Sequence, residues 1–373
     1  MTIITGYSGN DSAEKYWNFE TLKNPPRYRD DEVPESHYPG LRAIILDGVA
    51  EKGKRTQMFA YIGIPSGPVP AGGFPGVVLV HGGGGTALAW VAELWMSYGY
   101  AVIVPDWYGN RPLEQSYGKP TDLWKREPVK EERSHSKEDI EAHIANVSNL
   151  ILAHSLLLSL PEVDPDKTVY AGVSWGSWYG AMIAAVDPRF KGFIQIYLGD
   201  RKEDDSFING RFLHAAKAPL YYVTGTNDVA GSPLELQAGF NACGAMLGNR
   251  SMINDLCHGH CGFSFEICRR YADFILKNGV SLPVISDCIC RDGKIEARVT
   301  ECGKGIKKCF FNYTCDRDVS DWRERKWEAQ EVDFNDGMLH SQLPGKVFQC
   351  YFSAYDEEDI TTHCCGSSDV ITF

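Results

Sequence analysis

The chain has 373 residues, of which 43% are hydrophobic and 23% are charged, a balance typical of a globular protein with a large core and two domains. Its formal net charge of -12, with no block of basic residues, argues against nucleic acid and against an anionic membrane surface as partners. The sequence contains no long uninterrupted apolar run of the kind that spans a bilayer, so no membrane segment is predicted.

The N-terminal sequence MTIITGYSGNDSAEKYW lacks the basic and then apolar pattern of a signal peptide, which predicts a cytoplasmic protein. All 12 cysteines lie from Cys243 onward. Without a signal peptide, free thiols are expected rather than disulfides. The adjacent Cys364 and Cys365 also make simple pairing awkward.

The first part of the chain predicts an arm followed by strands. Residues 1–40 are polar and rich in Pro and Asp, with a helix expected at about 12–23. Residues 41–48 and 55–65 alternate between apolar and polar side chains, which predicts a pair of strands. Residues 73–85, GFPGVVLVHGGGG, form a continuous apolar run ending in glycines, typical of a strand buried on both faces of a mainly parallel sheet.

Helices and strands alternate in the next part. A helix is predicted at 88–100, a buried strand at 101–110 and a second helix at roughly 138–160. Residues 107–137 are highly charged. They predict either a solvated surface loop or a partial cover over a functional site.

The alternation continues to the end of the first domain. Residues 167–186 predict a strand, a tight turn and a helix, and residues 190–200 and 218–228 predict two more buried strands. The last strand lies within 250–263, and a helix follows at 264–276. This order predicts an α/β fold with a doubly wound, mainly parallel sheet and helices on both faces.

The character of the sequence changes after Gly279, because short strand patterns with turn residues between them predominate from 283 to 373. We predict a small C-terminal antiparallel β-sandwich domain there. The expected organisation is an N-terminal arm at 1–40, an α/β catalytic domain at 41–280 and a β-sandwich domain at 281–373.

The pattern G-x-S-x-G occurs at residues 172–176, between a predicted strand and a predicted helix. A serine at such a bend takes strained backbone angles, and small neighbours prevent clashes there. The bend presents the hydroxyl of Ser174 outward and places the amide of Trp175 at a helix N-terminus. Ser174 is therefore the predicted nucleophile, with a structural turn residue as the alternative.

A nucleophilic serine needs a base, and the base needs a group that orients it; both come from loops after later strands. Asp228 follows the next strand but one and is the predicted orienting acid, with Asp200 as its rival. Two histidines, His258 and His260, follow the last strand. His258 is the preferred base because it lies nearer to the strand and is followed by glycine.

His81 precedes four glycines at the end of an earlier predicted strand. Their unobstructed amides suit an oxyanion hole, with Gly83 or Gly84 as one donor and Trp175 as the other. A flexible loop is the alternative. A phosphate-binding loop is disfavoured because no Lys-Ser/Thr pair follows the glycines.

Aromatic residues near these motifs are candidate walls of a substrate pocket, because aromatic faces suit sugar rings. The candidates are Trp107, Trp178 and Tyr179, with His260 as a neighbour in the pocket. Packing in the core is the alternative for Trp178 and Tyr179.

A metal site at Cys257, His258, His260 and Cys261 is disfavoured because adjacent ligands crowd one another and the spacing misses the usual C-x-x-C form. No metal and no cofactor are expected.

With the strand, HGGGG, GVSWG, Asp228 and HGH in that order, residues 40–280 resemble the α/β-hydrolase superfamily. Within it, VVLVHGGGGTALAWV and GYAVIVPDWYGN look like the branch of dienelactone hydrolases, acetyl xylan esterases and prolyl-oligopeptidase-like enzymes. The segments DWRERKWEAQEV, LHSQLP and GSSDVI are similar to a small β-domain behind some bacterial acetyl-xylan-esterase-like hydrolases. The resemblance implies a triad of Ser174, Asp228 and His258 and the hydrolysis of acyl esters.

We therefore expect a serine carboxylesterase that cleaves acetyl esters of a small molecule or an oligosaccharide. A serine peptidase or a lactone hydrolase of the same fold is an alternative, although the dienelactone branch usually carries a cysteine nucleophile. A catalytically inert carbohydrate-binding protein is the alternative from another class. The Trp and Arg residues of DWRERKWE predict a cation–π contact, an interface with the first domain or a homodimer contact.

Overall fold

A computed structural model describes most of the chain, which divides into two compact units. The described residues are 12–31, 39–112, 126–130, 133–134, 136–198 and 211–373. The first unit comprises residues 1–195, 202–219 and 259–264. The second comprises residues 196–201, 220–258 and 265–373.

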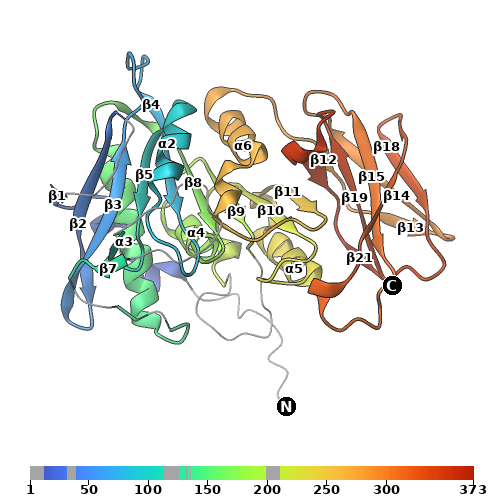
Figure 1. Ribbon diagram of the computed structural model, residues 1–373, viewed down its shortest axis with the longest axis horizontal. Helices are drawn as coiled ribbons and strands as arrows, with labels where there is room; N and C mark the ends of the chain where they lie inside the picture. Colours follow the sequence, from blue (N-terminus) through green and yellow to red (C-terminus); the bar gives the residue numbers. More distant parts are fainter. Residues whose placement is uncertain (1–11, 32–38, 113–125, 131–132, 135, 199–210) are drawn as a thin grey trace. The chain divides into compact units, whose positions relative to one another are not determined.

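The first unit is built on a sheet whose strands run in the order β1-β2-β3-β5-β4-β8-β9 (Figure 1). The strands are β1 (Tyr28–Asp30), β2 (Leu41–Glu51), β3 (Lys54–Gly63), β4 (Phe74–Val80), β5 (Ala101–Pro105), β8 (Val163–Val173) and β9 (Gly192–Ile196). Strands β2 and β3 form the predicted antiparallel pair, and β4 lies parallel to both β5 and β8.

Three helices cover this sheet: α2 (Ala89–Ser97), α3 (Ile140–Leu158) and α4 (Trp175–Val186). The chain moves from β4 to β5 in one direction across the sheet and then from β5 to β8 and β9 in the other. Because such crossovers are right-handed, α2 lies on one face and α3 and α4 lie on the other. The packing of α3 against α4 agrees with this, and the predicted doubly wound α/β fold is confirmed.

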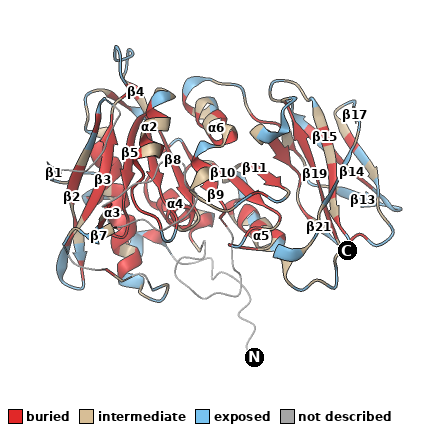
Figure 2. Cartoon of the chain, viewed as in Figure 1, coloured by how far each residue is buried: buried red, intermediate tan, exposed pale blue. Residues whose placement is uncertain are grey.

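The central strands are apolar because both faces are covered. Residues Val77–Val80 and Val102–Ile103 have no exposed surface, and Figure 2 shows β4 and β5 as largely buried. The glycines after β4 end the strand and open the loop at His81. The predicted buried strands therefore deliver their loops to one edge of the sheet, as in other parallel α/β folds.

The N-terminal segment differs from its prediction. In place of one helix at 12–23, the chain forms a 3-10 turn, η1 (Ala13–Lys15), and a short helix, α1 (Phe19–Leu22). Asn18 takes an extended backbone between them, which interrupts the helix. Trp17 anchors the segment by donating its indole N–H to the carbonyl of Ile144 at 3.1 Å.

Part of the charged segment 107–137 forms a hairpin of β6 (Asn110–Pro112) and β7 (Arg126–Pro128). Most of the rest of this segment lies outside the described residues, and so does Asp200. Two further 3-10 turns belong to the first unit: η2 (Leu213–Ala215) and η4 (His260–Ser264).

The second unit begins with a strand–helix–strand element. Strands β10 (Leu220–Gly225) and β11 (Leu247–Ile253) pair in parallel, as predicted, with α5 (Pro233–Cys243) between them in the chain. Ser232 and Glu235 form a reciprocal capping box at the start of α5. The turn η3 (Gly244–Met246) leads into β11, and α6 (Glu266–Lys277) is the predicted helix at 264–276.

Two antiparallel sheets follow in the same unit, with strand orders β12-β14-β18-β17 and β16-β15-β19-β20. Strand β13 pairs with β14, and β21 pairs with β19. The elements are β12 (Val284–Ile285), β13 (Ile289–Arg291), β14 (Lys294–Glu301), β15 (Lys308–Thr314), η5 (Trp322–Glu324), β16 (Glu328–Glu331), β17 (Phe334–Asn335), β18 (Met338–Gln342), β19 (Gln349–Tyr355), η6 (Ile360–Thr362), β20 (Cys365–Ser367) and β21 (Ile371–Thr372).

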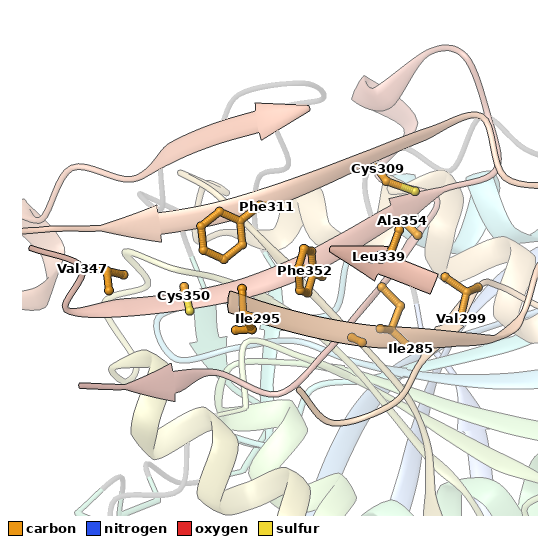
Figure 3. Close-up of a cluster of buried hydrophobic side chains, with 11 residues drawn as sticks. Ile285, Ile295, Val299, Cys309, Phe311, Leu339, Val347, Cys350, Phe352 and Ala354 are labelled. Atoms are coloured by element: carbon orange, nitrogen blue, oxygen red, sulfur yellow. The ribbon is translucent and has the colours of Figure 1, made fainter. Parts of the chain in front are cut away.

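A shared core joins these two sheets into the predicted sandwich. Ile295 and Leu339 from one sheet pack with Phe311 and Phe352 from the other, and none of the four has exposed surface (Figure 3). The alternation of buried and exposed residues in β14 places one face of that strand on this core.

The sandwich is also bonded to β11 within the second unit. Ser251 donates its hydroxyl to the carbonyl of Cys365 at 2.5 Å, and Arg250 Nε donates to the carbonyl of Ser367 at 3.2 Å. The Ser367 hydroxyl accepts from the amide of Met252 at 2.9 Å. Strand β11 and the sandwich therefore form one body.

All twelve cysteines are free thiols, as the sequence predicts, and Cys364 and Cys365 are buried. Within the described part of the chain, no helix combines the length and the apolar character needed to cross a bilayer.

Candidate active site

Ser174 lies at the turn between β8 and α4 with a strained backbone. Its φ of 54° and ψ of -113° fall in a region of backbone angles that residues other than glycine rarely occupy. The carbonyl of Ser174 accepts from the amides of Ser177 and Trp178 at 2.9 and 3.2 Å. These bonds start the helix directly at Trp175, so the amide of Trp175 lies at a helix N-terminus.

Both glycines of the motif are required by close backbone approach. A Cβ atom at Gly172 would lie 2.4 Å from the carbonyl carbon of Gly176. A Cβ atom at Gly176 would lie 2.1 Å from the carbonyl oxygen of Val80 at the end of β4. The turn at Ser174 therefore packs against the neighbouring strand through bare backbone, as expected of a sharp strand-to-helix bend.

The glycine loop after β4 lies beside this serine. A Cβ atom at Gly82 would lie 3.1 Å from the Cβ atom of Ser174. At Gly83, it would lie 2.9 Å from Cδ1 of Trp175. The structure thus brings Gly83 together with Trp175, the two residues predicted to supply oxyanion donors.

The amide of Gly84 has a different partner. It donates to the hydroxyl of Tyr108 at 3.1 Å, and burial raises the pKa of that phenol. Arg126 lies over the Tyr108 ring at 4.7 Å and donates to the carbonyl of Gly85 at 2.5 Å. Of the two predicted glycine donors, Gly84 is therefore already engaged by a side chain.

The predicted pocket aromatics form a stack around Trp175. Trp107 lies parallel to Trp175, with ring centroids 5.5 Å apart, while Trp178 meets Trp175 at 5.3 Å with a steep tilt. Tyr179 meets Trp107 edge-on at 4.9 Å. Trp107, Trp178 and Tyr179 are only 1%, 7% and 0% exposed, whereas Trp175 is half-buried.

Tyr179 is held in place by polar contacts as well as by packing. Its hydroxyl lies 3.0 Å from His143 Nδ1 and accepts from Asn146 Nδ2 at 2.9 Å. Burial raises the pKa of Tyr179 and lowers the pKa of His143. These rings form the support behind the serine turn.

The second unit contains the predicted acid and base. Asp228 follows β10 and is 1% exposed, and both of its carboxylate oxygens lie 3.0 Å from His258 Nδ1. Asp228 also accepts from the amide of Ala230 at 2.6 Å. A carboxylate can only accept a hydrogen bond, so this contact places the proton of neutral His258 on Nδ1 and leaves Nε2 able to take a proton.

His260 belongs to the first unit and has another environment. Its Nε2 accepts from the amide of Gly82 at 3.0 Å, so that nitrogen is engaged by the glycine loop. The two neighbouring histidines thus have different partners: a carboxylate for His258 and a backbone amide for His260.

Several residues that contact the glycine loop, His258 or Asp228 were not predicted from the sequence. Tyr108 bonds the glycine loop, Tyr197 lies 4.5 Å from the His258 ring between centroids, and Trp322 donates its indole N–H to the carbonyl of Asp228 at 2.8 Å. Only Trp322 had a signal, the Trp and Arg residues of 321–328. No group of three or more His, Cys, Asp or Glu able to hold a metal ion occurs among the described residues.

A family model described as "Alpha/beta hydrolase family" matches residues 77–273, which is more than half of the chain. This range includes the glycine loop, the serine turn and the Asp228–His258 pair. No curated protein matches the sequence.

Solved structures of similar fold include an acetyl xylan esterase from Paenibacillus sp. R4, with 17% identity, a TM-score of 0.54 and coverage of 72% of this chain and 95% of that one. Acetyl xylan esterase 1 from Thermoanaerobacterium sp. JW/SL YS485 has 16% identity, a TM-score of 0.42 and coverage of 66% and 88%. Acylaminoacyl peptidase from Pyrococcus horikoshii has 12% identity, a TM-score of 0.47 and coverage of 65% and 43%. At these identities the likeness concerns the fold.

Proposed function

Because the chain belongs to the alpha/beta hydrolase family, we propose that it is a serine carboxylesterase with Ser174, His258 and Asp228 as its catalytic triad. The observation that carries the proposal is the strained backbone of Ser174, with φ of 54°, at a strand-to-helix turn bracketed by two glycines that cannot be replaced without a clash. A turn residue without a function needs neither feature. The Asp228–His258 pair is the second support, since a nucleophilic serine requires an oriented imidazole.

In the proposed reaction, Nε2 of His258 takes the proton of the Ser174 hydroxyl as the oxygen attacks the ester carbonyl carbon. Asp228 holds the ring in the tautomer that leaves Nε2 free to do so and stabilises the imidazolium that forms. The imidazolium then protonates the leaving alcohol. Water then gives a proton to His258 as its oxygen attacks the acyl carbon, and His258 returns that proton to Ser174 Oγ as the acyl–oxygen bond breaks, which releases the acid and restores both residues.

The negative charge on the carbonyl oxygen needs donors that are fixed before the reaction begins. We assign these donors to the amides of Trp175 and Gly83, because Gly83 lies against the Trp175 side chain, and not to the amide of Gly84, which donates to Tyr108. Removal of one such donor typically costs about 3–4 kcal/mol in the transition state. The bonds of Tyr108 and Arg126 to the loop keep its shape and so preserve the direction of the Gly83 amide.

For the substrate class, we propose acetyl esters of carbohydrates. The support is the acetyl xylan esterase whose fold matches 72% of this chain, together with the aromatic side chains beside the serine. Since Trp107, Trp178 and Tyr179 are buried, Trp175 is the member of the group best placed to meet a sugar ring. The buried rings would hold Trp175 in position.

The test is labelling by a serine-directed fluorophosphonate, followed by hydrolysis of a panel of p-nitrophenyl esters and acetylated xylo-oligosaccharides. We expect wild type and the exposed control Ser66→Ala to be labelled and active on acetyl esters, and Ser174→Ala to be neither. The loss of kcat in Ser174→Ala is expected to be roughly 10⁴-fold to 10⁶-fold.

The alternatives give other results in the same test. Labelling with turnover of peptide substrates or lactones, and not of acetyl esters, would indicate a peptidase or a lactone hydrolase. Wild type that is neither labelled nor active would overturn the enzyme proposal and indicate an inert carbohydrate-binding protein.

A further inference from the structure

The loop that contains Asp228 is bonded to the β-sandwich in two directions. Trp322 donates its indole N–H to the carbonyl of Asp228 at 2.8 Å. In return, Nδ2 of Asn227 donates to the carbonyl oxygens of Trp322, Arg323 and Arg325 at 3.2, 3.1 and 2.8 Å. The side-chain amide of Asn227, the residue directly before Asp228, thus contacts three backbone carbonyls of the sandwich.

Residues 315–327, which connect β15 to β16, supply Trp322. This connection is stiffened by its own contacts: the carboxylate of Asp321 accepts from the amide of Arg323 at 3.0 Å, and Arg325 Nε donates to the carbonyl of Val319 at 3.0 Å. The Arg325 guanidinium also lies 4.9 Å from the ring centroid of Phe348. The indole of Trp322 is therefore presented from an ordered element.

The loop that contains His258 is bonded to the same sandwich. Asn254 directly follows β11 and donates through Nδ2 to Oδ1 of Asn312 on β15 at 3.0 Å. The hydroxyl of Tyr351 on β19 donates to Oδ1 of Asn254 at 2.8 Å. Asn312 is itself fixed by donating to the hydroxyl of Ser353 at 2.9 Å. Both oxygen and nitrogen of the Asn254 amide are thus held by neighbouring strands of one sheet.

We propose that the β-sandwich positions the Asp228–His258 pair, with Trp322 acting on the acid loop and Tyr351 acting through Asn254 on the histidine loop. The proposal rests on the proposed function for its catalytic consequence. A catalytic contact must be held to within a fraction of an ångström by groups that do not themselves react. Here the sandwich bonds the backbone on the acid side and the amide of Asn254 on the base side, and these bonds set the distance between carboxylate and imidazole.

A purely structural role for the sandwich predicts a different pattern of effects. Strand β11 already has its own bonds to the sandwich through Ser251, Arg250 and Ser367. If the sandwich only covered strand β11, loss of the Trp322 indole N–H would change the free energy of unfolding without changing the contact between Asp228 and His258. The two roles are therefore separable by measurement.

The experiment uses the full chain and the variant Trp322→Phe, which keeps an aromatic ring and removes the N–H donor. Trp327→Phe is the matched control, because Trp327 belongs to the same connection and packs its ring on Tyr351 at 5.6 Å. We expect Trp322→Phe to lower kcat for p-nitrophenyl acetate roughly tenfold to a hundredfold with little change in KM, as a misplaced catalytic group does. The control should keep the wild-type values, and both variants should keep the wild-type thermal midpoint.

A second readout does not depend on turnover. The NMR signal of the His258 Nδ1 proton, assigned by its loss in His258→Gln, reports the bond to Asp228. It should weaken through exchange with water in Trp322→Phe and in Tyr351→Phe, and persist in Trp327→Phe. If Trp322→Phe does not fold, Tyr351→Phe alone decides the question.

An unchanged signal and an unchanged kcat in folded Trp322→Phe or Tyr351→Phe overturn the positioning role. If wild type hydrolyses no ester but its proton signal depends on Trp322 as expected, the proposed function fails while the positioning role stands.

Discussion

The serine turn of the first unit and the acid and histidine loops of the second are built by different means. Ser174 is placed mainly by backbone packing: two glycines, a helix start and close contact with the end of β4 fix it. Asp228 and His258 are placed by side chains, which bond them to each other and bond their loops to the sandwich. The comparison teaches that the proposed nucleophile is fixed mainly by backbone packing, whereas the proposed acid and base depend on side-chain hydrogen bonds to the sandwich.

The sharpest test of this comparison sets His258 of the second unit against His260 of the first. We expect His258→Ala to lower kcat roughly 10⁴-fold to 10⁶-fold, as removal of a triad base does. His260→Ala removes the acceptor of the Gly82 amide, and a loss of about tenfold at most is expected from a looser loop. Steady-state kinetics on p-nitrophenyl acetate distinguish them.

The reverse result would break the comparison. If His260→Ala were as inactive as Ser174→Ala while His258→Ala kept its activity, nucleophile and base would both come from the first unit. The contact between His258 and Asp228 would then be structural.

A second test concerns the backbone-built region. In Gly176→Ala the new methyl group meets the carbonyl oxygen of Val80 at 2.1 Å, so strand and helix must separate. We expect a loss of roughly 3 kcal/mol in the free energy of unfolding, with a lower thermal midpoint and a lower soluble yield. Gly345→Ala in the sandwich is the control, since nothing lies within 4 Å of its added Cβ. Equal stability of the two variants would show that the serine turn tolerates side chains.

The smallest expected effect is on the pH dependence of the free energy of unfolding, through a buried pair in the first unit. His154 on α3 bonds Asp187 at the end of α4 at 2.8 Å, and both side chains are fully buried. Burial lowers the pKa of His154 below its ordinary value of 6.5 despite the attraction of Asp187. The unfolded state therefore takes up this proton first, and stability is lost as the pH falls below about 6.5, by about 1.4 kcal/mol for each pKa unit of difference.

Asp187 extends the effect to lower pH. Burial alone would raise the pKa of this carboxyl, but the His154 ring and Arg189 lower it below its ordinary value. The stability it contributes is present above about pH 4 and is lost as the pH falls further. The check is the thermal midpoint between pH 7 and pH 5, which should fall less in His154→Gln than in wild type. His340→Gln, at an exposed site of the sandwich, should fall as wild type does.

Sequence patterns predicted the parts of the site that are local. The apolar strand, the two glycines and the helix after Ser174 lie within one short segment, so periodicity and turn chemistry were enough to predict the bend. The order of strands also indicated the loops of Asp228 and His258. The sequence favoured His258 over His260 only by its place nearer to the strand and the glycine after it. Their different hydrogen-bond partners, Asp228 and the Gly82 amide, could not be predicted.

The supports of the site could not be predicted, because their partners are far apart in the chain. Trp322 and Asp228 are 94 residues apart, and Asn254 and Asn312 are 58 apart. Tyr108 carries no distinguishing pattern, since a tyrosine after a strand usually packs in the core. The Trp and Arg residues of 321–328 predicted a cation–π contact, an interface with the domain predicted at 41–280 or a homodimer contact. Arg323 lies over the Trp322 ring at 5.8 Å and Trp322 bonds Asp228 of that predicted domain, but the sequence did not indicate this partner.

The bonds between β11 and the sandwich limit how such a chain can diversify. A detachable accessory module can be gained, lost or exchanged by recombination at its linker. Here the sandwich shares buried hydrogen bonds with Ser251 and Met252. Removal of the chain beyond about residue 280 would therefore leave those polar groups without these hydrogen-bond partners. We therefore expect changes in the C-terminal region to be accompanied by changes in β11.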